Sequence, residues 1–304
     1  MKQQERTGQK IKISAGEQVL HGVNIILILL ATFVCVYPFY YMLIYSVSDA
    51  SKVLGGIYFL PKGFTLQTYK WIFATSDFGH AFWISGTRTV IQTVLCLLGS
   101  SLFAYLVTQR DMIGRKFVYR FVVITMYLSA GLIPWYITMK SYHLNNTYWL
   151  YIIPGIVNAY YVILLKTFIE QIPDSLQESA SIDGAGFFKI YWSIIMPLSK
   201  PILATVAVYA SVGAWNSWQD NYLLVNDVKL QTVQLILYNC INQAQRIADS
   251  MKSGMTSIGG AGVTMTADNV RMATTIVAVF PIMLVYPFLQ KYFVKGVMMG
   301  AVKG

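Results

Sequence analysis

The sequence predicts an all-α membrane protein with six transmembrane helices, because of its composition, its charge-free segments and the placement of its basic residues. Hydrophobic residues make up 56% of the 304 residues, and charged residues make up only 12%. Soluble domains average about 45–50% apolar and about 25% charged residues. The chain therefore carries too few charges to cover a soluble surface, and a lipid bilayer is the solvent that suits its composition.

Six segments contain no Asp, Glu, Lys or Arg, and each reaches the length of about 18 residues that a membrane-crossing helix needs. Hydrocarbon offers no hydrogen-bond partners to the backbone, so each segment is expected to be helical. The first segment is too long for a signal peptide, and no small-residue cleavage site follows it. The six segments lie between Glu17 and Asp49, Arg88 and Arg110, Arg120 and Lys140, Lys140 and Lys166, Lys200 and Asp220, and Arg271 and Lys291.

The basic residues predict the orientation, because cytoplasmic loops carry an excess of Lys and Arg. The tight loop Gln109–Arg120 holds four basic residues and is the strongest indication of a cytoplasmic side. An even number of spans then places both termini in the cytoplasm. The predicted organisation is a cytoplasmic N-terminal segment (1–20), a six-span domain (21–295) with a cytoplasmic loop (172–200), and a cytoplasmic C-terminal tail (296–304).

The long segment before the last span is expected to lie outside. Its part Gln231–Gln245 lacks charge but carries several Gln and Asn, which favours a helix on the outer surface over a seventh span. The following stretch, Ser253–Ala267, is rich in Gly, Ser, Thr and Met and is expected to be irregular.

The residue types exclude several classes of function. The net charge of +10 does not indicate nucleic-acid binding, because the basic residues are spread between apolar segments, where anionic lipid explains them. The three histidines and three cysteines have no metal or redox spacing, and no phosphate-binding glycine loop occurs, so no cofactor or metal is expected in this chain. A membrane enzyme would need a polar catalytic cluster, and the predicted spans contain no such cluster. An ion-driven secondary transporter would show internal repeats and buried carboxylates, and neither is found in the sequence.

The loop between the fourth and fifth predicted spans is the most informative part of the chain. Its residues predict two short helices around a glycine turn: Pro173 suits a first helical position, and Gly184 can adopt positive φ. Asp183 is expected to cap a second helix over 187–195, and Pro201 helps to separate that helix from the fifth span. These properties fit both a structured loop on the inner membrane face and a protein-docking site.

The same loop resembles the EAA motif of ABC importer permeases, which reads Glu-Ala-Ala, then Gly, then Ile-x-Leu-Pro. Ser179 replaces the first Ala, and Met196 replaces the Leu. The Trp215-Asn216 pair and the C-terminal residues 286–304 resemble the carbohydrate-type, maltose-permease-like branch, and within it the subgroup that imports uronate-containing oligosaccharides. The positions that match the motif are Glu178, Ala180, Gly184, Ile194 and Pro197.

The resemblance implies one permease subunit of a sugar importer in a bacterial plasma membrane. The expected partners are a second permease subunit that forms a heterodimer, two cytoplasmic ATPase subunits that bind ATP and Mg, and an extracellular solute-binding lipoprotein. ATP hydrolysis is expected to reside in the ATPase subunits and not in this chain. An ABC permease for a non-sugar solute is the nearest alternative. The residues assigned by resemblance to ATPase coupling are Glu178, Ala180, Asp183, Gly184, Ile194 and Pro197.

A sugar pathway needs aromatic faces and polar groups within the spans. Each candidate also has a structural interpretation: a Trp that anchors at the membrane interface, an Asn that bonds helix to helix, and an Arg that extends to the interface. The candidate pathway residues are Trp215, Asn216, Trp218, Asp220, Asn158 and Arg88.

Overall fold

The computed structural model describes residues 15–53, 56, 59–74, 77–128, 130–252 and 266–301, and its regular secondary structure there is entirely helical. The helices, with η marking 3-10 or π turns, are α1 (Ala15–Ser46), α2 (Ala50–Val53), α3 (Gln67–Ala74), α4 (Phe78–Thr108), α5 (Arg115–Tyr127), α6 (Leu132–Ser141), η1 (Tyr148–Tyr151), η2 (Ile153–Gly155), α7 (Ala159–Ile169), α8 (Asp174–Ile182), α9 (Phe187–Ile190), η3 (Tyr191–Ile195), α10 (Met196–Leu198), α11 (Lys200–Asn216), α12 (Gln219–Leu224), η4 (Val228–Leu230), α13 (Val233–Lys252) and α14 (Ala267–Ala301).

Among the described residues, three helices are long and apolar enough to cross a membrane: Val19–Ser46 in α1, the whole of α4, and Ala267–Val285 in α14. Two bent pairs raise the number to five if each pair is one crossing. The η1–η2 turn meets α7 at 42°, and the segment Phe187–Leu198 meets α11 at 81°. The described helices thus give three to five candidate crossings, and the number six stays a prediction.

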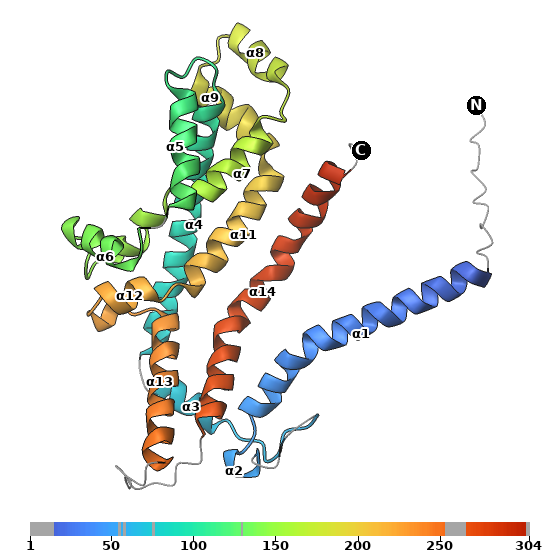
Figure 1. The fold of residues 1–304 in the computed structure, drawn as a ribbon, viewed down its shortest axis with the longest axis vertical. Coiled ribbons are helices and arrows are strands. Elements are labelled where there is room, and N and C mark those ends of the chain that lie inside the picture. Colours follow the sequence, from blue (N-terminus) through green and yellow to red (C-terminus); the bar gives the residue numbers. More distant parts are fainter. Residues whose placement is uncertain are drawn as a thin grey trace.

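The prediction of one continuous helix between Arg120 and Lys140 is wrong, because the segment is divided into α5 and α6. The backbone of Leu128 is extended, which ends α5, and Gly131 adopts φ 84 before α6 begins. A residue in each of these conformations interrupts the helical hydrogen-bond ladder. Figure 1 shows the result, with α5 beside α4 and α6 turned away from the bundle.

Helix α4 is the centre of the bundle, where it packs against both α7 and α11. A cluster of buried apolar side chains fills this junction. The contact is closest at Gly99, where an added Cβ would lie 2.6 Å from the carbonyl oxygen of Ile156. The bend before α7 therefore rests directly on the backbone of α4.

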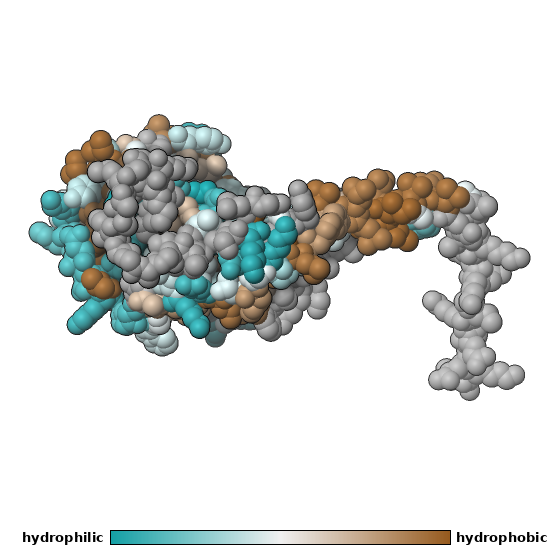
Figure 2. Space-filling model, turned by 90° about the horizontal axis from the view of Figure 1, so that it is seen from below, coloured by the Kyte–Doolittle hydropathy of each residue, from teal (hydrophilic) through white to brown (hydrophobic). Residues whose placement is uncertain are grey.

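Helix α1 leaves the bundle as a separate arm. It contacts α14, and none of the residues in its most apolar window is buried. Figure 1 shows the arm diverging from α14, and Figure 2 shows its largely hydrophobic surface. In a membrane, such a surface faces lipid or another protein chain.

The segment before α14 and the two chain ends differ in part from their expected bounds. Helix α13 is longer than the predicted Gln231–Gln245 helix, packs on α14 and α4, and is not among the candidate crossings of the described chain. Nearly all of Ser253–Ala267 lies outside the described residues. Helix α14 continues through Ala301, so most of the predicted tail 296–304 is part of a helix. Of the predicted segment 1–20, only 15–20 is described, as the start of α1.

The glycine packing at α4 can be tested with a matched pair of variants on the same helix. We expect Gly99→Ala to lower the melting temperature of the detergent-solubilised protein, because the new methyl group would overlap the backbone of Ile156. A Cβ at Gly86 meets nothing within 4 Å. Gly86→Ala should therefore stabilise α4 by about 0.5–1 kcal/mol. Equal melting temperatures for the two variants would contradict the close contact.

Candidate functional site

Two backbone hydrogen bonds define the turn between α8 and α9. The Ala185 N–H donates to the Ala180 carbonyl at 2.9 Å, and the Gly184 N–H donates to the Ser181 carbonyl at 3.0 Å. This pair of bonds is the Schellman motif, which requires a left-handed residue just after the helix, and Gly184 supplies it with φ 79. The glycine turn predicted from the sequence is thus present, held by hydrogen bonds of the backbone.

Two local predictions about this loop are wrong. Asp183 follows the last residue of α8 as its C-cap, where its N–H bonds back to the Ser179 carbonyl, and it does not cap the second helix. Gly186 precedes α9 instead. Pro173 stands just before α8 rather than at its first helical position. The second helix spans the expected residues, but its part Tyr191–Ile195 has the wider π-helical turn.

The structure divides the residues assigned to coupling into two groups. Glu178, Asp183, Gly184 and Pro197 are exposed, whereas Ala180 and Ile194 are half-buried and pack against the core beneath.

Exposed apolar side chains surround this turn. Ile182 is 86% exposed, and Phe187 and Phe188 are also largely exposed. Exposed apolar groups beside a rigid turn mark a contact surface for a protein or a membrane. We name Ile182, Phe187 and Phe188 the loop patch.

Helix α8 is tied to the basic loop that follows α4. Gln109 Nε2 donates to Gln177 Oε1 at 3.2 Å, and Arg110 forms an ion pair with Asp174. The exposed loop patch and the basic loop therefore lie at one end of the molecule, which is the upper end in Figure 1. The C-terminal end of α14 points toward the same end.

A second cluster lies around Arg88 of α4. The Arg88 side chain is only 2% exposed, forms an ion pair with Asp220 of α12, and lies 4.4 Å from the centre of the Tyr151 ring. Its Nη1 also donates to the Ser217 carbonyl at 3.2 Å. The interpretation of Arg88 as a side chain extended to the membrane interface is therefore wrong, because its charge is enclosed and paired within the protein.

Further hydrogen bonds continue this cluster. Asn221 Nδ2 donates to the Tyr151 hydroxyl at 2.6 Å, and that hydroxyl donates to the Leu230 carbonyl at 2.7 Å. Asn221 Oδ1 accepts from the Thr232 N–H, and Ser85 Oγ accepts from the Val233 N–H. We name the residues in this network the polar hub: Ser85, Arg88, Tyr151, Asp220, Asn221 and Thr232.

The polar hub connects α4, η1, α12 and the start of α13. Sequence reasoning identified only Arg88 and Asp220 among its members, because Tyr151, Asn221 and Thr232 lie far apart in the chain and match no motif. The available signal was the presence of two oppositely charged residues, Arg88 and Asp220, beside apolar segments of the sequence.

The remaining pathway candidates do not form a single site. Trp215 Nε1 donates to the Ala278 carbonyl at 3.0 Å and so joins α11 to α14. The ring of Trp218 stacks on Tyr238 of α13 at 4.3 Å between centroids. Asn216 is exposed, and its Oδ1 accepts a long bond of 3.4 Å from Gln234.

The Asn158 side chain caps a helix and does not bond one helix to another. Its Oδ1 accepts from the N–H groups of Tyr160 and Tyr161, so it caps the first turn of α7. A capping Asn satisfies backbone donors that the helix itself leaves unpaired.

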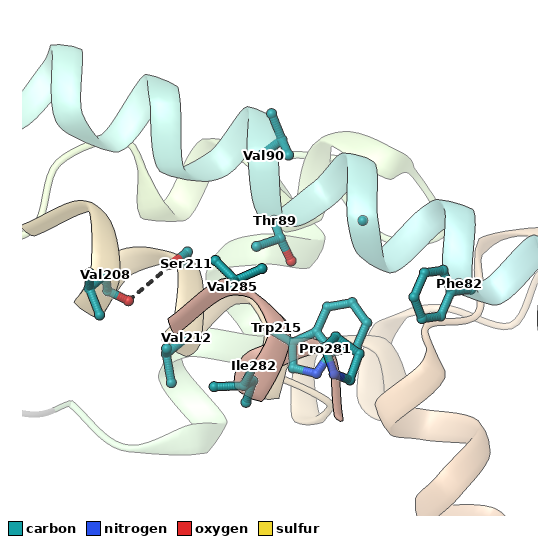
Figure 3. A pocket seen from close by; sticks show the side chains of 11 residues that line it. Phe82, Thr89, Val90, Val208, Ser211, Val212, Trp215, Pro281, Ile282 and Val285 are labelled. Carbon is teal, nitrogen blue, oxygen red and sulfur yellow. Dashed lines mark hydrogen bonds between the residues drawn. The ribbon is translucent and has the colours of Figure 1, made fainter. Parts of the chain in front are cut away.

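One cavity of about 290 Å³ lies between α4, α11 and α14. Figure 3 shows Trp215 and Phe82 at one part of it, with aliphatic side chains around the rest. The two hydroxyl groups in the lining are Thr89 and Ser211, and Ser211 bonds to the Val208 carbonyl of its own helix. This lining suits an apolar occupant and offers little to the hydroxyl groups of a sugar.

The described residues contain no group of three or more His, Cys, Asp or Glu side chains that could hold a metal ion. The arrangement provides a helical bundle with two notable features. One is the exposed unit of α8, the Gly184 turn and α9, which we name the elbow, and the other is the buried polar hub that joins α4 to η1, α12 and α13.

Comparison with known proteins identifies the class more closely. Residues 14–299 match the family described as "Binding-protein-dependent transport system inner membrane component", and the chain belongs to this family. It is 36% identical over 278 residues to the polygalacturonan/rhamnogalacturonan transport system permease protein YtcP of Bacillus subtilis, covering 91% of this chain and 96% of the relative. It is 34% identical to protein LplC of the same organism, covering 89% of this chain and 90% of the relative.

A solved structure shares the fold. A chain from a bacterial ABC transporter involved in the import of the acidic polysaccharide alginate superimposes with a TM-score of 0.77 and 25% identity, covering 92% of this chain and 98% of that chain. The fold is accordingly that of a type I ABC importer permease, as the resemblance of the EAA segment implied.

The ion pair of the polar hub predicts a large effect on stability. Asp220→Asn should destabilise the protein by about 3–5 kcal/mol, because it leaves the enclosed Arg88 charge without its counter-charge. The exposed pair of Arg110 and Asp174 supplies the control, since Asp174→Asn should cost about 1 kcal/mol or less. Denaturant titration of the detergent-solubilised protein measures both, and a small, equal loss in the two variants would show that Arg88 does not depend on Asp220.

Proposed function

We propose that this chain is the permease subunit of an ATP-binding-cassette importer and forms half of the translocation pathway for a uronate-containing oligosaccharide. The observation that carries this proposal is the similarity over nearly the full length to YtcP, whose name assigns it to polygalacturonan and rhamnogalacturonan transport. The alginate importer with the same fold also handles an acidic polysaccharide.

In this proposal the chain crosses the bacterial plasma membrane six times, with both termini and the loop 172–200 in the cytoplasm. The basic loop after α4 supports this orientation, because it adjoins α8 through Gln109 and Arg110. The bent pairs of helices and the divided segment around Gly131 supply the crossings that are not single long helices.

The partners in this proposal are a second permease, two ATPase subunits that bind ATP and Mg, and an extracellular binding lipoprotein. The loop patch is the surface that an ATPase subunit covers, because its apolar side chains are exposed beside a turn with fixed geometry. Glu178 and Asp183 lie exposed near this surface and meet polar or basic groups of the partner. Ala180 and Ile194 hold the elbow on the core of the permease.

The mechanism follows from the rigidity of this elbow. When ATP closes the ATPase dimer, the docked α8–α9 unit moves with it. The 81° bend around Pro197 and the start of α11 converts this displacement into a change in the tilt of α11. Such coupling requires that the elbow have one conformation, since a flexible link would absorb the motion. The pathway residues Trp215, Asn216, Trp218, Asp220, Asn158 and Arg88 remain candidates for contact with the sugar.

Purification of the chain from its native membrane tests the proposed function directly. We expect a second permease and an ATPase to accompany it, and we expect oligogalacturonides with the binding protein to stimulate ATP hydrolysis. Stimulation by amino acids or peptides instead would assign the chain to a non-sugar importer. A chain that purifies alone after gentle extraction would contradict the docking role of the loop and favour an ion-driven transporter.

The elbow itself is tested by placing the same side chain at two neighbouring glycines. Gly184→Ser forces a side chain into the left-handed region at φ 79, at a cost of about 1 kcal/mol or more, and should lower sugar uptake for each ATP hydrolysed. Gly186→Ser should retain coupling, because φ there is −74 and Ser is a favourable residue before a helix.

Neither serine meets another atom within 4 Å of its Cβ, so steric overlap within the chain is the same for the two variants. Uptake and hydrolysis are measured together in proteoliposomes, with the amount of assembled complex as the reference. Normal coupling in the Gly184 variant would contradict the assignment of this turn to ATPase coupling.

A further inference from the structure

The π-helical turn η3 joins the elbow to the helix that enters α11. Its Met196 N–H bonds to the Tyr191 carbonyl, five residues earlier, so the turn holds one residue more than an α-helical turn. Such turns are rare and occur frequently at functional positions, because the wider ring is less stable than the α-helical one.

Tyr191 is the residue that fixes this turn to α4. Its side chain is 1% exposed, and its hydroxyl lies 2.7 Å from the hydroxyl of Ser101, which is 2% exposed. Ser101 is positioned to donate its own hydrogen to carbonyl oxygens of α4, at Leu97 or Leu98. The Tyr191 hydroxyl is then the donor of the bond between them, because each hydroxyl has one hydrogen.

Aromatic contacts surround this bond. The Tyr191 ring lies 5.4 Å from the Tyr105 ring of α4 and 5.3 Å from the Trp192 ring. Phe188, a member of the loop patch, lies 6.1 Å from the Tyr191 ring. A continuous path of contacts thus runs from the exposed elbow, through Tyr191, to the central helix of the bundle.

This path differs from the covalent one. The chain reaches α11 through Pro197 and a bend of 81°, whereas the Tyr191 side chain reaches α4 directly. Helix α4 carries Ser85 and Arg88 of the polar hub. Through these residues α4 contacts η1, α12 and the start of α13. A displacement of the elbow that moves α4 therefore reaches the opposite part of the molecule as well.

We propose that the Tyr191–Ser101 hydrogen bond is the positioning contact through which the coupling loop moves α4, so that its loss uncouples ATP hydrolysis from transport. This inference rests on the proposed function, because it assigns a second route of transmission to the same loop. The bond is buried and made by two neutral hydroxyl groups, so its net energy is modest. Its role is to hold Tyr191 in one position relative to α4.

The chain provides a matched control beside this contact. Tyr105 is as deeply buried as Tyr191 and packs on it, but its hydroxyl has no hydrogen-bond partner among the described residues. Tyr105→Phe and Tyr191→Phe each delete one buried oxygen from the same aromatic pair. Only the second variant removes a bond between the loop and α4.

The experiment uses the assembled transporter in proteoliposomes, with oligogalacturonides as the probe and the binding protein present. Tyr191→Phe and Ser101→Ala should each lower sugar uptake per ATP hydrolysed by about fivefold, the equivalent of about 1 kcal/mol. The double variant should lose no more than either single variant, because both remove the same bond. Tyr105→Phe should keep the wild-type ratio, and all variants should assemble in normal yield.

A wild-type ratio in Tyr191→Phe would overturn the inference while the proposed function stands. An equal loss in Tyr105→Phe would do the same, because it would assign the effect to general packing. Additive losses in the double variant would also overturn it, because the two residues would then act separately. A wild-type complex without sugar-stimulated hydrolysis would remove the proposed function, and the inference with it.

Discussion

The contact between α4 and the two bent units beside it is the constraint on which the other elements depend. At Gly99 the backbone of the η2–α7 bend lies so close that no side chain fits between the two segments. Buried apolar residues of α7 and α11 also pack against Ala104 and Tyr105 of α4. Because α4 is long and unbroken, it fixes the relative positions of the elbow and the polar hub, which lie along it at different depths.

The polar hub encloses a charge within the protein, whereas the elbow exposes apolar side chains. At the hub, an enclosed charge is acceptable because Asp220, a backbone carbonyl and an aromatic face surround Arg88. At the elbow, apolar side chains are exposed and two backbone hydrogen bonds close the turn. The first arrangement holds elements of one chain together, whereas the second leaves an apolar surface for contact with a protein or a membrane.

Composition and the spacing of charges were sufficient to predict a helical membrane protein, and the glycine was sufficient to predict the turn at Gly184, because both depend on local chemistry. The number of six crossings stays a prediction. The break around Gly131 escaped the same reasoning, since an apolar segment is equally compatible with one long helix or two short ones. Asn158 was assigned to a helix interior, although capping is a common use of Asn wherever a helix begins.

The partnership of Arg88 with Asp220, and of both with Tyr151, depends on contacts between distant parts of the chain. No local rule predicts which distant partner a buried charge will find. The π-helical turn was likewise beyond sequence reasoning, because it follows from how Tyr191 and Ile195 pack on the core.

The length of the α1 arm relates the protein to the thickness of its membrane. Its apolar part, Val19–Ser46, has 28 residues, which at about 1.5 Å per residue extends about 42 Å. The hydrocarbon of a typical bilayer is only about 30 Å thick, so α1 must incline or draw thicker lipid around itself. Because α14 is the main contact of α1 in the described part of the bundle, the inclination of α1 responds to lipid composition more readily than that of the packed helices. Lipids with longer acyl chains should therefore bring α1 closer to the membrane normal.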